Sequence, residues 1–530
     1  MERTYEEALA RLSSLQSNLA VTSLFSKPSP APTPSSSSSA ASKPATEDLN
    51  ALAIPEMLAW LRRANITPRD LAGLKCIHVA GTKGKGSVCA FLTAILTHPA
   101  VRPRAGRVGT YTSPHLVSVR ERIQLEGEPI SRELFARYFF EVWDAFTASA
   151  RAELALSSSS SSSSEELQGP ATKPFYFRFL TILALHAFLR EGVASAVVEC
   201  GIGGEYDATN VLPAEAVTAS VVAQLGIDHV GMLGGTLPEI AWHKAGVCKE
   251  GRRCFTRSLE GGDGEEVMRV LRRRAAEKGA ELVEVDDAAV LRWGGVRSLE
   301  AGSLEGEFQK FNQALAVGAA REHLRVLENS SEPLGPTADS WLRDLPPGFA
   351  EGLQSARLRG RCETHVQGDV TWLIDGAHTA ESLEEVARWF VSKREMLSIS
   401  RWVLVFNQQE RDAAKMLHGL VQSINRLSGG KSKNVFSHAI FTRNDLQRRT
   451  DGEPEVDLSV QRAAADAMRV VSPDTEISVA DHVGEAVERV TALDEDARQD
   501  GGRGGVLATG SLHLVGALLR TLEPGTELRL

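Results

Sequence analysis

The apolar positions of the chain form short runs that alternate with helical patterns. Residues 75–80, 194–200 and 217–225 are apolar runs of strand length, and a glycine follows each of them. Residues 88–96, which come after the first run, predict a helix. Strands that alternate with helices indicate a parallel, doubly wound α/β sheet. Ligands of such sheets bind at the carboxyl ends of the strands, where these glycine turns lie.

A second block of the same kind begins near residue 300. Residues 371–375, 401–406 and 505–510 are apolar runs that again predict strands. They predict a smaller C-terminal Rossmann-like α/β domain, and the length of the chain is compatible with two or three domains. We place the boundary between 295 and 305, which gives domains of residues 1–300 and 301–530.

Two low-complexity stretches interrupt these patterns. Residues 27–47 are rich in Ser, Pro and Ala, and residues 157–166 are dominated by a run of serines. Both lack the apolar content that a core requires, so we expect disordered inserts without catalytic residues. Ahead of the first insert, helical spacing predicts a helix over residues 3–20. Its apolar positions are Ala8, Leu12, Leu15 and Leu19.

The composition narrows the class of protein. The chain has 530 residues, 42% of them hydrophobic, and a net charge of −9, which argues against nucleic-acid binding. Its six cysteines form no CxxC pair, so a zinc site is not indicated and a reduced, intracellular protein is expected. No apolar run reaches the roughly 18 residues of a membrane span. The acidic residues near the N-terminus do not resemble a targeting peptide, which favours the cytosol.

The first glycine turn has the chemistry of a phosphate-binding loop. Backbone N–H groups in a strand-to-helix turn cradle phosphate oxygens, a lysine neutralises their charge, and a hydroxyl can serve a magnesium ion. The strict P-loop pattern would have glycine at 79 and Ser or Thr at 86, where this chain has Val79 and Gly86. A glycine turn with two solvated lysines remains the alternative. The loop residues are Gly81, Thr82, Lys83, Gly84, Lys85, Gly86 and Ser87.

The departure from the strict pattern is itself informative. The Gly-Thr-x-Gly-Lys-Gly-Ser spelling resembles the Mur ligase superfamily, in particular its folylpolyglutamate synthase branch, and the segments 3–5 and 14–18 resemble the fungal form. The resemblance runs from about residue 3 to residue 520. Further matching motifs are 113–116, 119–123, 199–204, 207–210, 225–229, 240–246, 360–361, 375–378 and 510–516.

The resemblance implies a metal site and catalytic residues in the first domain. It implies that Ser113, Glu199 and His229 hold Mg²⁺, and that Lys85, Lys244 and His229 act in catalysis. It also implies that Lys244 is carbamylated, and it allows a monovalent cation. Taken alone, Glu199 could cap a glycine turn, His229 could be structural, and Lys244 could be a phosphate-binding or surface lysine.

In the second domain, the resemblance implies that Arg361 and Asp375 contact ATP, and that Asn312 lies near the adenine. An internal Arg361–Asp375 salt bridge is the alternative. Phe308 stands where the family usually has histidine, and Arg359 stands where a proline commonly precedes Gly-Arg.

These resemblances imply ATP-dependent addition of L-glutamate to the γ-carboxylate of a reduced folate, through an acyl phosphate, with release of ADP. We expect a monomer with ATP and Mg²⁺ as cofactors, and no nucleic-acid or membrane partner. The expected location is cytoplasmic, with a mitochondrial form as the alternative. The nearest rival is a dihydrofolate synthase, or a bifunctional enzyme, that acts on dihydropteroate. A regulatory nucleotide-binding module without ligase activity and a GTPase-like protein are rivals of other classes.

Overall fold

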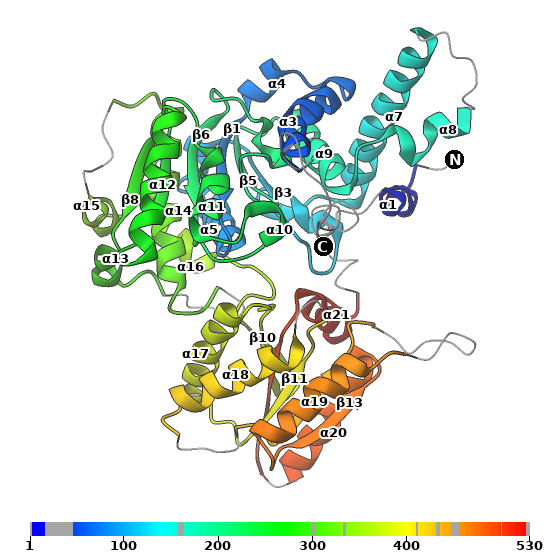
Figure 1. The fold of residues 1–530 in the computed structure, drawn as a ribbon, viewed down its shortest axis with the longest axis vertical. Coiled ribbons are helices and arrows are strands. Elements are labelled where there is room, and N and C mark those ends of the chain that lie inside the picture. The colour runs from blue at the N-terminus through cyan, green and yellow to red at the C-terminus, as the bar shows by residue number, and fades with distance from the viewer. Residues whose placement is uncertain are drawn as a thin grey trace, which may run out of the picture. The chain divides into compact units, whose positions relative to one another are not determined.

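The computed structural model divides the chain into two compact units (Figure 1). The N-terminal unit comprises Met1–Pro114, Arg122–Val296 and Lys310–Leu353, and the C-terminal unit comprises the remaining segments His115–Glu121, Arg297–Gln309 and Gln354–Leu530. The structure describes residues 3–15, 46–156, 164–297, 304–331, 335, 337–409, 412–430, 435–446, 456–499 and 501–525.

An eight-stranded sheet organises the N-terminal unit, in the order β4-β3-β2-β5-β1-β6-β7-β8. The strands from β2 to β8 in this order run parallel, and β3 and β4 add an antiparallel edge. The strands are β1 Lys75–Ala80, β2 Val108–Tyr111, β3 Ile123–Leu125, β4 Glu128–Pro129, β5 Ser195–Glu199, β6 Val217–Val222, β7 Arg253–Arg257 and β8 Glu281–Val285.

Helices connect these strands. The longer ones are α3 Thr46–Arg63, α5 Lys85–Thr97, α7 Arg132–Leu156, α9 Tyr176–Arg190, α12 Asp263–Glu277 and α14 Gln309–Leu327. The shorter ones are α1 Tyr5–Ser14, α4 Pro68–Gly73, α6 Arg102–Ala105, α8 Ser164–Gln168, α10 Val230–Leu233, α11 Leu237–Lys244, α13 Asp287–Trp293, α15 Ala338–Arg343 and α16 Phe349–Ser355. The 3-10 turns are η1 Val119–Arg122, η2 Pro170–Thr172, η3 Ala208–Val211 and η4 Ala245–Val247.

The C-terminal unit is built on a six-stranded sheet in the order β13-β12-β11-β14-β10-β9, in which β9 alone is antiparallel. Alternate side chains of its strands enter two cores: Leu373 packs with α17, α18 and α19, and Trp372 packs with α20 and α21. Helices therefore cover both faces of the sheet. The elements are β9 Glu363–Gln367, β10 Val370–Ile374, α17 Ala380–Met396, β11 Arg401–Phe406, α18 Ala413–Leu427, β12 His438–Thr442, α19 Ser459–Val471, β13 Glu476–Ala480, α20 Val483–Gln499, β14 Gly504–Thr509 and α21 Leu512–Leu522.

The doubly wound α/β fold predicted from the sequence is confirmed in both sheets. The apolar runs at 75–80 and 401–406 form β1 and β11 over the predicted residues. The predicted helix over 3–20 is described as far as residue 15, and α1 ends at Ser14, so Leu19 lies outside the described residues. Most of the two predicted inserts also lies outside them.

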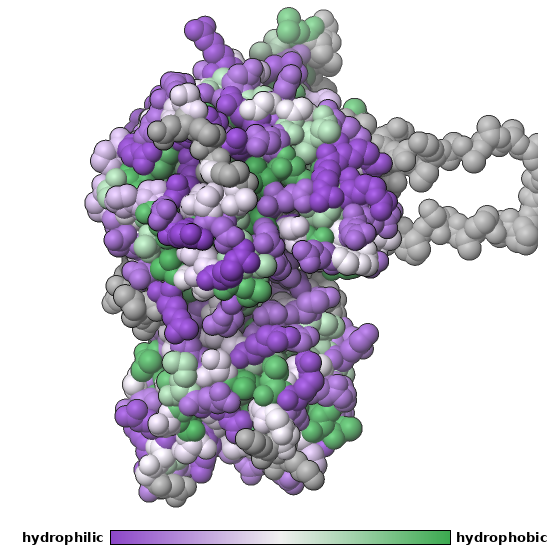
Figure 2. All heavy atoms as spheres, turned by 90° about the vertical axis from the view of Figure 1, so that its left-hand side faces the viewer, coloured by the Kyte–Doolittle hydropathy of each residue, from purple (hydrophilic) through white to green (hydrophobic). Residues whose placement is uncertain are grey.

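On the face that Figure 2 draws, hydrophilic and hydrophobic side chains are interleaved. Within the described part of the chain, no helix combines the length and the apolar character needed to cross a bilayer. All six cysteines are buried and unpaired.

Candidate active site

The glycine turn after β1 is shaped as a phosphate-binding loop. The backbone N–H groups of Thr82 and Lys83 donate to the carbonyl oxygen of Gln224 over 2.9 and 3.0 Å. The Thr82 hydroxyl donates to the Gly226 carbonyl oxygen over 3.0 Å, which fixes the loop against the turn after β6. Helix α5 then begins at Lys85, and its first N–H groups are the natural anion site of a helix N-terminus.

Two glycines in this loop leave no room for a side chain. Gly84 has φ of +80° and is the N-cap of α5. A Cβ at Gly84 would overlap the Asn312 side-chain oxygen, and a Cβ at Gly81 would lie 2.9 Å from the Cβ of Ala223. The loop therefore requires glycine at both positions, and Asn312 at the start of α14 lies against it.

Lys244 also meets the phosphate loop. It is the last residue of α11, its side chain is buried, and its Nζ donates to the carbonyl oxygen of Gly81 over 2.9 Å. The pKa of Lys244 is lowered to about 7, mainly by burial and also by the nearby Lys85 charge. Lys244 is thus a partly neutral amine at the base of the loop, which excludes the surface-lysine alternative.

Ser113 and Glu199 come together at the ends of neighbouring strands. The Ser113 backbone N–H donates to Glu199 Oε2 over 3.0 Å, and Glu199 is buried at the end of β5. Carboxylate and hydroxyl oxygens suit Mg²⁺, which prefers hard oxygen ligands. No group of three His, Cys, Asp or Glu residues suited to a metal occurs among the described residues. The chemistry of this donor pair fits magnesium, which usually keeps several water ligands as well.

His229 lies in the turn after β6 and is half-exposed. Its backbone is left-handed, with φ of +49°, and its N–H donates to Asp228 Oδ1 over 2.9 Å. The ring Nε2 lies 3.9 Å from Asp228 Oδ2. An imidazole that is 46% exposed is not a buried structural histidine.

In the C-terminal unit, Asp375 follows β10 and is tied to its own turn. Its two carboxylate oxygens accept the backbone N–H groups of Cys362 and Ala377 over 2.7 and 2.8 Å. Burial raises the pKa of Asp375, and the Arg361 charge opposes this rise. The guanidinium of Arg361 donates to the Gly360 carbonyl oxygen over 3.3 Å. Arg361 and Asp375 therefore lie in the two turns that flank the β9–β10 hairpin at its open end.

The two departures from the family pattern have structural explanations. Phe308 packs against the apolar core formed with α17, α18 and α19, a position that favours a hydrocarbon ring over imidazole. Arg359 forms ion pairs with Glu363 and Glu523 at 2.7 and 2.8 Å. Arg359 thereby fixes the start of the Gly360 turn with side-chain contacts that a proline could not make.

A buried polar network that the sequence did not single out links β1 to the glycine loop after β5. His78 Nε2 lies 2.8 Å from the Thr209 hydroxyl, which donates to Asp207 over 2.6 Å. The Asp207 carboxylate also accepts the Ile202 N–H over 2.9 Å. Burial lowers the pKa of His78 to about 3, so the ring stays neutral. A histidine within an apolar strand is the signal that could have indicated this network.

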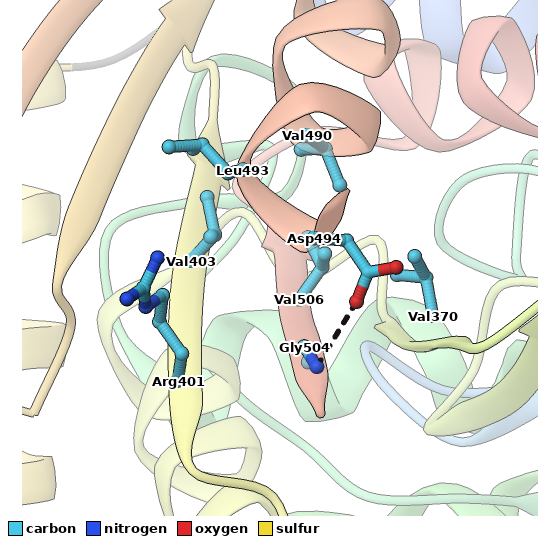
Figure 3. A pocket seen from close by; sticks show the side chains of 9 residues that line it. Val370, Arg401, Val403, Val490, Leu493, Asp494, Gly504 and Val506 are labelled. Atoms are coloured by element: carbon cyan, nitrogen blue, oxygen red, sulfur yellow. Dashed lines mark hydrogen bonds between the residues drawn. The ribbon is translucent and has the colours of Figure 1, made fainter. Parts of the chain in front are cut away.

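The C-terminal unit contains a small cavity (Figure 3). It is at the starts of β11 and β14, opposite the edge where Asp375 lies. Asp494 lines it and accepts the Gly504 N–H over 3.1 Å. The cavity has room for about one water molecule, so it is no substrate site.

Comparison with known proteins places this arrangement in a family. Residues 358–521 match the family model described as the C-terminal domain of dihydrofolate synthetase. The chain is 37% identical to the folylpolyglutamate synthase of Neurospora crassa, over 99% of this chain and 93% of that protein. It is 35% identical to the folylpolyglutamate synthase of Saccharomyces cerevisiae, over 98% of this chain and 86% of that protein.

Solved structures share the fold. The structure of Mycobacterium tuberculosis folylpolyglutamate synthase complexed with ADP aligns with a TM-score of 0.64 at 24% identity, over 90% of this chain and 97% of that one. The apo form of the L. casei enzyme aligns with a TM-score of 0.63 at 20% identity, over 98% of this chain and 99% of that one. With the curated relatives matched over nearly their full length, the chain belongs to the folylpolyglutamate synthase family.

Proposed function

We infer that this chain is an ATP-dependent ligase that adds L-glutamate to folates. Two relatives that are named folylpolyglutamate synthase, from Neurospora crassa and Saccharomyces cerevisiae, match almost the whole chain. The observation that supports the proposal most directly is the hydrogen bond from Lys244 Nζ to the Gly81 carbonyl oxygen, in the loop that precedes Lys85. Lys244 thereby helps to fix this loop, and Lys85 with the first N–H groups of α5 supplies the positive charge that a nucleoside triphosphate requires.

The proposed reaction proceeds in two displacements. A γ-carboxylate oxygen of tetrahydrofolate, or of its terminal glutamate, attacks the γ-phosphorus of ATP, and ADP leaves. The amine of incoming glutamate then attacks the acyl phosphate, phosphate leaves, and the amine loses its proton. Lys85 and the first N–H groups of α5 neutralise charge that accumulates on the transferring phosphoryl group. Asn312, Arg361 and Asp375 are proposed as further contacts of the nucleotide.

Magnesium is the proposed metal of this site. Ser113, Glu199 and His229 would hold it, with the hydroxyl and carboxylate oxygens as its harder ligands. When bound, Mg²⁺ would offset phosphate charge. The Glu199 carboxylate is held in place by the Ser113 N–H, which keeps one oxygen oriented before any ligand arrives. A monovalent cation at this site is a further proposal.

We also propose that Lys244 is carbamylated. A neutral amine can attack CO₂ to form a carbamate with release of one proton, and the lowered pKa of Lys244, about 7, provides that neutral amine. The product is an anion beside Lys85, which would relieve the repulsion between the two lysine charges. Bicarbonate labelled with ¹³C tests this: a carbamate carbon resonance should be present in the wild type and absent in Lys244→Ala.

Product analysis tests the activity. Purified protein with tetrahydrofolate, L-glutamate and ATP should yield folates lengthened by glutamate, together with ADP and phosphate in equal amounts. Release of AMP and pyrophosphate, or hydrolysis of ATP without folate products, would contradict the proposal. Omitting glutamate is the control, because the acyl phosphate then has no amine acceptor.

A second candidate is dihydrofolate synthase activity, which the description of the matching family model favours. It differs only in the acceptor, because dihydropteroate would replace the folate. Offering dihydropteroate as the sole acceptor separates the two candidates. Glutamylation of tetrahydrofolate without glutamylation of dihydropteroate would leave the first proposal alone.

A further inference from the structure

The connection between β2 and β3 is divided between the two units. Residues 115–121 belong to the C-terminal unit, whereas Pro114 and Arg122 on either side belong to the N-terminal unit. The base of the connection is closed within the N-terminal unit, where the Thr112 N–H donates to the Arg122 carbonyl oxygen over 3.0 Å. We call residues 115–121 the tether.

Glu121 gives the tether its shape. Its carboxylate accepts the backbone N–H groups of Leu116, Val117 and Ser118 over 2.9, 2.8 and 2.6 Å. Three N–H donors on one carboxylate are charge-assisted hydrogen bonds, which are stronger than neutral ones. The tether is therefore a compact turn rather than an open loop.

The tether is packed into the C-terminal unit. Leu116 lies between two glycines: a Cβ at Gly516 of α21 would overlap its carbonyl oxygen, and a Cβ at Gly360 would lie 3.0 Å from its side chain. Val117 is buried, and its carbonyl oxygen accepts a hydrogen bond from the Arg520 guanidinium. The two glycines provide the close approach that a helix and a turn with side chains would prevent.

These contacts reach the residues proposed to bind the nucleotide. Gly360, which touches Leu116, immediately precedes Arg361. Val117 belongs to the same apolar core as Ile374, the last residue of β10, and Asp375 follows directly. A shift of the tether within its core would therefore be felt at the two turns that hold Arg361 and Asp375.

The other end of the tether reaches the proposed metal site. One residue, Pro114, separates the tether from Ser113, whose N–H binds the Glu199 carboxylate over 3.0 Å. A hinge of one residue gives little slack, because a single residue spans at most about 3.6 Å. The position of Ser113 and the packing of Leu116 are thus mechanically linked.

We propose that the tether is a positioning element that couples the two turns of Arg361 and Asp375 to Ser113, with Leu116 and Glu121 as its positioning residues. The inference rests on the proposed roles of Ser113, Arg361 and Asp375. Packed side chains and a fixed backbone are the kind of contiguous element that carries coupling between distant sites. Contacts of the nucleotide with the C-terminal unit would thereby set the orientation of the proposed metal ligand.

The test compares two glycine-to-alanine variants in helices of the C-terminal unit. Gly516→Ala places a Cβ against the Leu116 carbonyl oxygen and displaces the tether, whereas Gly419→Ala in α18 adds a Cβ where nothing lies within 4 Å. Hydrogen–deuterium exchange of the full chain without ligands is measured first. Turnover and its dependence on Mg²⁺ concentration are measured second.

Gly516→Ala should speed exchange in the tether and also at Thr112 and Ser113, which lie in the N-terminal unit. Its kcat should fall about tenfold, because small misplacements of reacting groups are costly, with a smaller change in the KM for folate. The Mg²⁺ concentration for half-maximal activity should rise about tenfold. Gly419→Ala should match the wild type in all three measurements.

Faster exchange confined to the tether and α21, with wild-type kcat and Mg²⁺ dependence, would overturn the coupling.

Glu121→Gln is a second variant in case Gly516→Ala does not fold, since it keeps the side-chain shape but removes the charge that holds three N–H groups. Glu121→Asp keeps the negative charge on a shorter side chain, so it should restore part of the wild-type kcat and Mg²⁺ dependence. If the wild type makes no lengthened folates, the proposed function fails, and the exchange at Thr112 and Ser113 still decides the coupling.

Discussion

The two units of this protein hold their site residues in different ways. In the N-terminal unit, groups from separate segments bind one another: Lys244 binds the phosphate loop, and Ser113 binds Glu199. In the C-terminal unit, the Asp375 carboxylate binds the backbone of its own turn and of the turn before β9. The first arrangement depends on how several loops converge, whereas the second is confined to the two ends of one β-hairpin.

The two units also differ in what their buried ionisable groups do. Lys244 in the N-terminal unit stays available to a ligand, whereas Asp375 in the C-terminal unit stabilises the fold. Burial lowers the pKa of Lys244 to about 7, and burial raises the pKa of Asp375. In both residues burial disfavours the charged form. For Asp375, two backbone N–H donors offset part of that cost. Lys244 has a carbonyl oxygen and a neighbouring cation instead, so it keeps its reactivity.

The sharpest test of the comparison is the removal of the phosphate-loop charge. Lys85→Ala should lower ligase turnover on the order of 1000-fold, because the lysine stabilises the transferring phosphoryl group. Steady-state release of ADP and the folate product profile measure it. Arg269→Ala removes an exposed positive charge on α12 and is the matched control. An equal loss in both variants would show that Lys85 supplies only net charge.

Glu199→Gln tests whether the N-terminal carboxylate serves a ligand. Glutamine keeps an oxygen that can accept the Ser113 N–H, so the fold should be retained, while the negative charge is lost. We expect turnover to fall about 100-fold with little change in the unfolding midpoint. Wild-type turnover at all Mg²⁺ concentrations would contradict the proposed metal role of Glu199.

Asp375→Asn tests the structural side of the comparison. Asparagine has one side-chain oxygen, so one of the N–H groups of Cys362 and Ala377 would face an amide NH₂. The free energy of unfolding should fall by about 1–3 kcal/mol. Urea denaturation measures it. Unchanged stability together with lost turnover would instead give Asp375 a purely catalytic role.

The pH dependence of the free energy of unfolding tests whether the pKa of the buried Lys244 amine is depressed. The folded-state pKa of Lys244, about 7, lies below its ordinary value of 10.5, so between these values the unfolded state binds more protons. Stability should therefore rise with pH across this window by up to about 1.4 kcal/mol per unit, relative to Lys244→Met. Denaturation at pH 7, 8 and 9 in carbonate-free buffer measures the slope. Parallel curves for the two proteins would exclude a depressed pKa.

Much of the fold followed from the pattern of apolar residues. The runs at 75–80 and 401–406 predicted β1 and β11, because buried parallel strands are continuous apolar stretches of five or six residues. Helix α5 was predicted three residues short at its start, because Lys85 and Gly86 carry no apolar signal and the helix begins within the glycine loop. The antiparallel edge formed by β3 and β4 gave no sequence signal, since these strands are very short.

What the sequence by itself determined is local: a glycine turn after a buried strand, a lysine and hydroxyl in it, and a carboxylate at the end of another strand. These follow from residue type and spacing along the chain. Only the tertiary structure decided that Lys244 is buried against Gly81, that His78 joins Thr209 in a buried network, and that residues 115–121 pack in the C-terminal unit. Such relations depend on contacts between segments far apart in sequence, and burial and pKa follow from those contacts rather than from the residue alone.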